Sequence, residues 1–137
     1  MASKMAIEKP RVIIVDNDPD TTNLLAGVFK LKRLQVFKAP TAEACLEILN
    51  AQFGKIDCMV VDGEIAEDRG AMLIVNARRI SKNIVILVIA DEDSVKTRVL
   101  DYGADEFAVK PMSTENVADK VFNLIATTGR RGVRVQK

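Results

Sequence analysis

The chain has 137 residues, enough for one domain of ordinary size, and 48% of them are hydrophobic while 28% are charged. Its 20 Lys and Arg residues against 19 Asp and Glu give a net charge of +1, so charge gives no argument for a nucleic acid or an anionic membrane as partner. The absence of histidine excludes a His-based zinc site, a Ser-His-Asp triad and imidazole acid–base chemistry.

Five short apolar segments rich in β-branched residues predict β-strands. They lie at Val12–Val15, Leu34–Phe37, Cys58–Val61, Ile84–Ile89 and Phe107–Val109. The first, third and fourth segments show no alternation with polar residues, which is typical of parallel strands covered on both faces.

Helical patterns separate these segments. The first helix is predicted to begin with Asp18 as N-cap and Pro19 as first residue. Its apolar face comprises Leu24, Leu25, Val28 and Phe29. Further helices are predicted over Thr41–Asn50, over Ala71–Ile80, around Val99 up to Gly103, and after the cap Ser113. Strands alternating with helices predict an α/β fold, a doubly wound five-stranded parallel sheet with helices on both faces.

The chain is expected to divide into an N-terminal extension over 1–10, a domain over 11–127 and a basic tail over 128–137. No apolar run reaches the roughly 18 residues of a membrane span, and the first ten residues lack the pattern of a signal peptide. Cys45 and Cys58 lie among apolar residues and are interpreted as reduced core residues. We therefore expect a cytoplasmic protein with no membrane and no direct nucleic-acid partner.

Polar residues follow the ends of the predicted strands. Asp16 and Asn17 follow the first strand, Asp62 and Glu64 the third, and Lys110 the fifth. Ligands of open parallel sheets bind beyond the carboxyl ends of the strands, where the strand order reverses. With the common order 2-1-3-4-5, Asp16 and Asp62 would share one crevice, and Lys110 would reach into it from the side.

Two carboxylates held this close favour a hard divalent cation, Mg²⁺ above all, bound through oxygen ligands and retained waters. A carboxylate beside Mg²⁺ and a lysine is also a plausible nucleophile for phosphoryl transfer, because both cations neutralise the phosphoryl oxygens.

Taken together, these segments resemble the response-regulator receiver domains of two-component signalling, from about Arg11 to Ile125. Residues 12–19, Val-Ile-Ile-Val-Asp-Asn-Asp-Pro, are similar to the family's apolar strand, acidic pair and helix start. Residues 57–62 resemble the acceptor segment. Residues 103–111 are the closest match, with the Gly-Ala-Asp turn, an aromatic residue at Phe107 and the Lys-Pro pair.

The resemblance implies the flavodoxin-like receiver fold and a role for each matching residue. Asp62 would be the phosphoacceptor, and Lys110 would contact the phosphoryl group. Mg²⁺ would be held at Asp16, Asn17, Asp62 and the backbone carbonyl of Glu64. The partners would be a histidine kinase or phosphotransfer protein and an unidentified downstream protein.

The chain also departs from the family's pattern. Asn17 stands where the family has a second acidic residue, which removes one formal charge from the metal site. The loop expected after the acceptor is unusually charged at Glu67, Asp68 and Arg69. The switch positions would be Phe107 and Ile89 (or Val88). At the second of these positions the family has a Ser or Thr, and the side chains of Ile and Val cannot donate a hydrogen bond.

The sequence leaves two main functions open. One is a single-domain response regulator that accepts a phosphoryl group on Asp62 and, lacking room for an output domain, signals through protein contacts. The other is a degenerate receiver that works as a phosphorylation-independent interaction module. Neither is an enzyme beyond assisting its own phosphorylation and dephosphorylation.

Three other interpretations fit poorly. Asp16-Asn17-Asp18 matches the Asp-x-Asp opening of aspartyl-phosphate hydrolases, but Asp20 stands where that family has Thr or Val. A calcium loop starting at Asp16 would have Thr21 in place of the turn glycine. A flavin-binding variant of the fold would need a phosphate loop where this chain has an acidic one.

Overall fold

The five predicted strands form one parallel sheet in the order β2-β1-β3-β4-β5. The computed structural model describes residues 9–68, 70–91 and 96–128. The strands are β1 Arg11–Val15, β2 Gln35–Ala39, β3 Cys58–Asp62, β4 Val85–Ala90 and β5 Glu106–Val109. The α/β class, the strand order and the parallel direction predicted from the sequence are confirmed.

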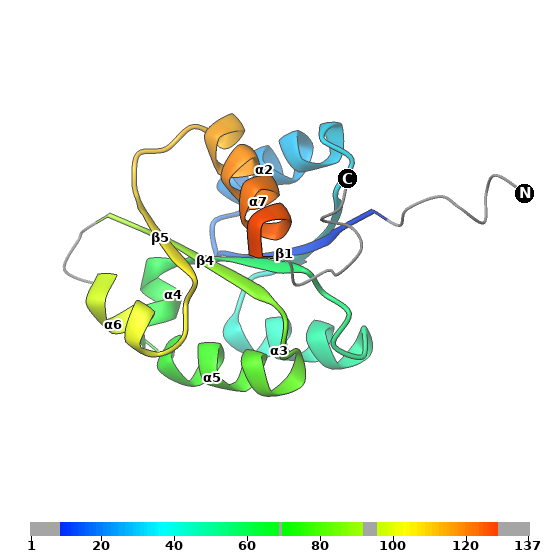
Figure 1. The fold of residues 1–137 in the computed structure, drawn as a ribbon. Coiled ribbons are helices and arrows are strands. Elements are labelled where there is room, and N and C mark those ends of the chain that lie inside the picture. Colours follow the sequence, from blue (N-terminus) through cyan, green and yellow to red (C-terminus); the bar gives the residue numbers. More distant parts are fainter. Residues whose placement is uncertain (1–8, 69, 92–95, 129–137) are drawn as a thin grey trace, which may run out of the picture.

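Helices cover both faces of this sheet. They are α2 Pro19–Leu31, α3 Ala42–Ala51, α4 Gly63–Asp68, α5 Gly70–Ile80, α6 Lys96–Asp101 and α7 Thr114–Thr128. In Figure 1, α2 and α7 lie above the sheet, and α3, α4, α5 and α6 lie below it. The three-layer arrangement follows from the crossovers, because the helices between successive parallel strands carry the chain back to the start of the next strand, and α7 after β5 packs beside α2.

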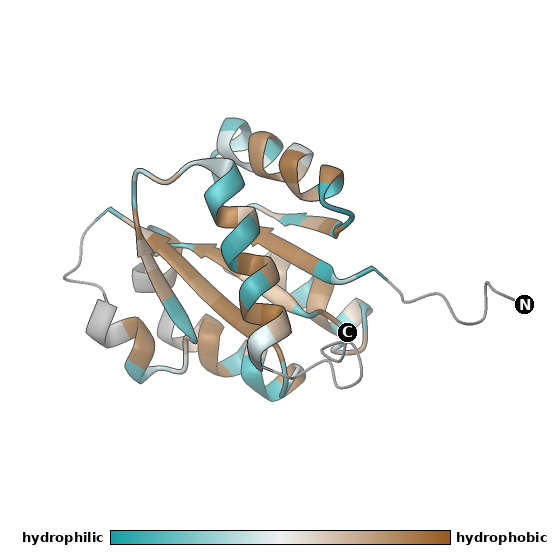
Figure 2. Ribbon diagram, turned by 45° about the horizontal axis from the view of Figure 1, so that its top comes forward, coloured by the Kyte–Doolittle hydropathy of each residue, from teal (hydrophilic) through white to brown (hydrophobic). Residues whose placement is uncertain are grey.

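The sheet separates two apolar cores. Ile13, Met59 and Ile86 face the layer of α3 to α6, and Ile14 and Leu87 face α2 and α7. Neighbouring residues of β1 and β4 thus point to opposite faces, as strand geometry requires. Figure 2 shows the hydrophobic strands in the centre and hydrophilic stretches on the outer surfaces of the helices. Burial on both faces explains why the central strands lack polar alternation.

Side chains cap three of the helices, and two of these caps, Asp18 and Ser113, were predicted from the sequence. Asp18 Oδ1 accepts a hydrogen bond from Asp20 N at 3.2 Å, and Pro19 is the first residue of α2. Thr41 Oγ1 accepts from Ala44 N at 3.0 Å before α3, and Ser113 Oγ accepts from Asn116 N at 3.1 Å before α7. Each hydroxyl or carboxylate satisfies a backbone amide that has no partner within its own helix.

The structure corrects two local predictions. The charged loop expected after the acceptor is a helix as far as Asp68, because α4 begins directly at Gly63. Leu24 was expected on the buried face of the first helix but is 64% exposed, whereas Leu25 and Phe29 of the same predicted face are buried. The predicted extension and tail fall outside the described residues except for 9, 10 and 128.

Both cysteines are free and buried, which confirms their interpretation as core residues. Cys45 Sγ lies 3.8 Å from Met59 Sδ, and burial raises the pKa of the Cys45 thiol to about 12. Within the part of the chain that the structure describes, no helix is long and apolar enough to cross a membrane.

Candidate functional site

Asp62 ends β3, which lies between β1 and β4, and the strand order reverses between β1 and β3. Its side chain is only 7% exposed, and Lys110 Nζ lies 2.6 Å from its Oδ1. Its other oxygen, Oδ2, accepts a hydrogen bond from Glu64 N at 3.1 Å. The carboxylate is thus oriented at both oxygens, as a positioned nucleophile requires.

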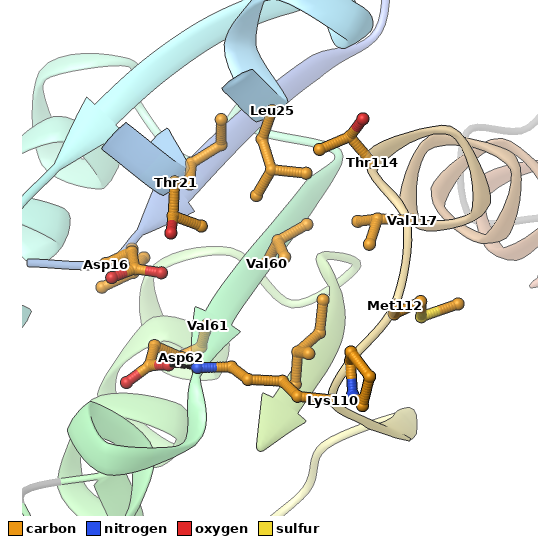
Figure 3. Close-up of a pocket in the computed structure, with 14 residues that line it drawn as sticks. Asp16, Thr21, Leu25, Val60, Val61, Asp62, Lys110, Met112, Thr114 and Val117 are labelled. Atoms are coloured by element: carbon orange, nitrogen blue, oxygen red, sulfur yellow. Dashed lines mark hydrogen bonds and ion pairs between the residues drawn. The ribbon is translucent and has the colours of Figure 1, made fainter. Parts of the chain in front are cut away.

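Lys110 comes directly after β5 and reaches across the end of β4 to this carboxylate (Figure 3). Its backbone N donates to Ala90 O at 2.8 Å, which fixes the point from which the side chain starts. Burial alone would lower the pKa of Lys110, but the hydrogen bond and the charge of Asp62 outweigh burial and raise it. The ammonium therefore stays protonated and available to an anionic oxygen.

Asp16 lies on the other side of Asp62, directly after β1 (Figure 3). Its Oδ1 accepts a hydrogen bond from Asp18 N at 2.9 Å, and its backbone N donates to Ala39 O at 3.1 Å. Burial raises the pKa of Asp16, and the nearby charge of Asp62 raises it further. This pair of carboxylates is the acidic crevice expected from the sequence, and a cation placed between them would relieve their repulsion.

The oxygen atoms around this crevice suit a hard cation. Within residues 9–68, 70–91 and 96–128, no three His, Cys, Asp or Glu side chains gather closely enough to form a metal site by themselves. A cation would therefore depend on Asp16 and Asp62 together with carbonyl oxygens and water, which is the ligand set that Mg²⁺ accepts. Asn17 is exposed beside Asp16, and the amide of Glu64 is already held against Asp62.

A cavity of about 280 Å³ adjoins the acidic crevice. Asp16, Thr21, Asp62, Lys110 and Thr114 contribute its polar groups. The apolar residues lining it come from the ends of β1, β3 and β4 and from α2 and α7, and they include Ile14, Leu25, Val60, Ile89 and Val117. Figure 3 shows the polar groups of Asp16, Asp62 and Lys110 on one side and the apolar side chains of Leu25, Val60 and Val117 on the other. The cavity is therefore charged beside Asp62 and largely apolar beyond it.

The two predicted switch positions lie on opposite faces of the sheet. Ile89 pairs with Asp62 in the β3–β4 register and belongs to the core under α2 and α7. Phe107 pairs with Val88 and packs against the core on the other face. The register thus places Ile89, rather than Val88, beside the acceptor.

Sequence reasoning missed two supporting positions, Gly63 at this end of the sheet and Arg78 at the opposite end, where β4 and β5 begin. Gly63 follows Asp62 and leaves no room for a side chain, because a Cβ there would lie 2.2 Å from that of Ala90. Arg78 donates hydrogen bonds to the carbonyls of Ile84 and Gly103 and contacts Asp105 Oδ2 at 3.2 Å. A glycine directly after an acidic strand end was the available signal for Gly63, whereas the contacts of Arg78 are distant in sequence.

The chain matches the family model described as the response regulator receiver domain over residues 12–122. It is 32% identical over 129 residues to the transcriptional regulatory protein PrrA of Mycobacterium leprae, covering 92% of this chain and 53% of that protein. It is 23% identical to the aerobic respiration control protein ArcA of Escherichia coli K12, covering 92% of this chain and 52% of that protein. The chain thus spans about half the length of these curated relatives.

Solved structures share the fold at lower sequence identity. A CheY-like receiver domain protein from Methanospirillum hungatei superposes with a TM-score of 0.80 at 18% identity, covering 90% of this chain and 99% of that one. A response regulator from Burkholderia pseudomallei, solved with a phosphorylated aspartic acid, a calcium ion and citrate, gives a TM-score of 0.74 at 18% identity. That match covers 93% of this chain and 72% of the other.

Proposed function

The chain belongs to the response regulator receiver family of two-component signalling, and from this premise we propose that it accepts a phosphoryl group on Asp62. The donor would be a histidine kinase or a phosphotransfer protein, and the signal would pass on through protein contacts in the cytoplasm. Receiver domains are generally signalling modules rather than enzymes, and phosphorylation on an aspartate is generally expected of them. The observation that carries the proposal is the 2.6 Å pairing of Lys110 Nζ with Asp62 Oδ1 beside Asp16.

The proposed transfer follows from the positions of these groups. An oxygen of Asp62 attacks the phosphorus, an O–P bond forms, and the P–N bond to the donor's imidazole breaks with its electron pair left on nitrogen. Lys110 meets the negative charge on the phosphoryl oxygens, and the Glu64 amide holds the carboxylate that attacks. No histidine of this chain takes part, because it has none.

Receiver domains generally bind Mg²⁺ at the acidic site, where the cation neutralises phosphoryl oxygens during transfer. In this chain Asp16 and Asp62 would hold it, with the carbonyl of Glu64 and the amide of Asn17 as further oxygen donors. Asn17 contributes no charge, so the site would hold a divalent cation with two carboxylates rather than three. We therefore expect cation binding to be weaker than in receivers with two acidic residues in this loop.

A second candidate is a degenerate receiver that binds its partner without phosphorylation. Ile89 favours it, because an apolar side chain stands at the β4 position paired with Asp62, where it cannot hydrogen-bond a phosphoryl oxygen. Lys110 and Asp62 nevertheless contact each other, and Asp16 lines the same cavity, which favours the phosphoacceptor.

Phosphorylation by acetyl phosphate separates the two candidates. The phosphoacceptor is expected to gain one phosphoryl mass in the presence of Mg²⁺, Asp62→Asn to gain none, and Asp16→Asn to gain it more slowly. Asp119→Asn, a change on the exposed surface of α7, serves as the matched control and is expected to behave as the unmodified chain. An unmodified protein that never gains the mass would instead support the degenerate receiver.

A further inference from the structure

The peptide after the acceptor packs unusually closely against β4. Asp62 pairs with Ile89, and α4 begins at the next residue, so Gly63 lies beside Ala90, the last residue of β4. A Cβ at Gly63 would lie 2.2 Å from Ala90 Cβ, 3.0 Å from Ala90 Cα and 3.3 Å from Ile89 O. The first distance is too short for any non-bonded pair of carbon atoms, and the second is tighter than most such contacts, so a methyl group here must displace one of the two segments.

Space rather than backbone conformation requires this glycine. Gly63 is not among the glycines with a positive φ, which are Gly54 and Gly103 within the described residues. The local backbone therefore admits a side chain, and the approach of Ala90 is what excludes it.

Neither the peptide between Gly63 and Glu64 nor Ala90 can move away without disturbing the acceptor Asp62. On one side, the next amide, Glu64 N, donates to Asp62 Oδ2 at 3.1 Å. On the other, Ala90 O accepts from Lys110 N at 2.8 Å, at the root of the side chain that pairs with Asp62. The Gly63–Ala90 contact thus links the peptide that orients the carboxylate to the strand end that orients the ammonium.

We propose that Gly63 is a positioning residue for phosphoryl transfer at Asp62, and that its bare Cα holds the Glu64 peptide and the Lys110 backbone at the spacing that the transfer needs. This inference rests on the proposed phosphoacceptor function. Gly63 does not touch the phosphoryl group and acts through its two neighbours.

The test compares Gly63→Ala with the space-restoring double variant Gly63→Ala/Ala90→Gly. Gly63→Ala is expected to slow phosphorylation by acetyl phosphate about 10-fold or more, because displacements near 1 Å have effects of that size. The double variant is expected to recover part of this loss, because the 2.2 Å contact is removed while the 3.0 Å contact to Ala90 Cα remains. Gly27→Ala is the matched control, since a Cβ at Gly27 meets nothing within 4 Å, and we expect it to leave the rate unchanged.

Readouts without phosphorylation separate positioning from general destabilisation. In the metal-free protein, Gly63→Ala is expected to shift the amide NMR signals of Glu64 and Lys110, whereas Gly27→Ala leaves them in place. If Gly63→Ala does not fold, the double variant is compared with Ala90→Gly alone. The remaining 3.0 Å contact to the backbone then predicts slower phosphorylation of the double variant.

The outcomes distinguish this inference from the proposed function. An unmodified protein that is not phosphorylated overturns the proposed function and the inference with it. Equal phosphorylation of the unmodified protein and Gly63→Ala overturns the inference alone. Equal rates for the double variant and Ala90→Gly overturn it as well if the single variant does not fold.

Discussion

Replacing Ile89 with threonine should strengthen the response of this receiver to phosphorylation. Ile89 pairs with Asp62 and lines the same cavity, so a hydroxyl there would face the phosphoryl group. A hydrogen bond to a charged group contributes about 1.5 to 3 kcal/mol. That energy corresponds to about a 10- to 150-fold change in the ratio of two conformations. Since the states of a switch differ by a few kcal/mol, the unmodified protein should shift only partly.

The assay is amide NMR during addition of beryllofluoride with Mg²⁺, followed in α6 and around Phe107. Ile89→Thr should enlarge the chemical-shift changes relative to the unmodified protein. Val88→Thr is the matched control, because Val88 is buried in the core on the opposite face, where a hydroxyl cannot reach Asp62. A complete two-state shift in the unmodified protein would refute the reasoning and show that another donor replaces the missing hydroxyl.

Three further predictions concern the cation, the fold and the thiols. Asn17→Asp should tighten Mg²⁺ binding about 5- to 30-fold, because an added charge contributes about 1 to 2 kcal/mol at an effective dielectric near 20. The control Asn50→Asp, at an exposed position, should leave Mg²⁺ binding unchanged. Equal titration curves for Asn17→Asp and the unmodified protein would mean that Asn17 lies outside the coordination sphere. Arg78→Met should lower the free energy of unfolding in urea by about 2 kcal/mol, because it removes the guanidinium that contacts two carbonyls and Asp105. The control Arg79→Met, at an exposed position, should change this free energy by less than about 0.5 kcal/mol. Burial raises the pKa of Cys45 from 9.0 to about 12, so the contribution of this thiol to stability is complete below pH 9 and is lost as the pH rises toward 12. Cys45 in the folded protein should therefore resist alkylation by iodoacetamide at about pH 8. Rapid alkylation without unfolding would contradict the burial of Cys45.

The sequence predicted the sheet well because its main signals are local. Continuous apolar strands are typical of two-sided burial, and the predicted caps Asp18 and Ser113 mark helix starts through their own hydrogen bonds. Strand ends differed from prediction by one or two residues, as at β2, where the buried Leu34 precedes the strand rather than beginning it. The short helix α4 was missed because six residues starting with glycine show too little periodicity to predict one.

The site was predictable only in part because its geometry depends on register. Asp16, Asp62 and Lys110 could be brought together from the rule that ligands bind at the switch point. The choice between Ile89 and Val88 could not be made, because a shift of one residue moves a side chain to the other face of the sheet. Gly63 and Ala90 are 27 positions apart, so their close approach could be identified only once the β3–β4 register was known.

Direct mapping of the phosphorylated residue tests the central claim most sharply. The unmodified protein would be treated with acetyl phosphate and Mg²⁺, the acyl phosphate reduced with borohydride, and the modified peptide identified by mass spectrometry. We predict a single modified residue, Asp62, and a much lower yield when Mg²⁺ is removed by chelation. Modification at Asp16 would contradict the account and favour the hydrolase-like interpretation, and no modification at all would favour the degenerate receiver.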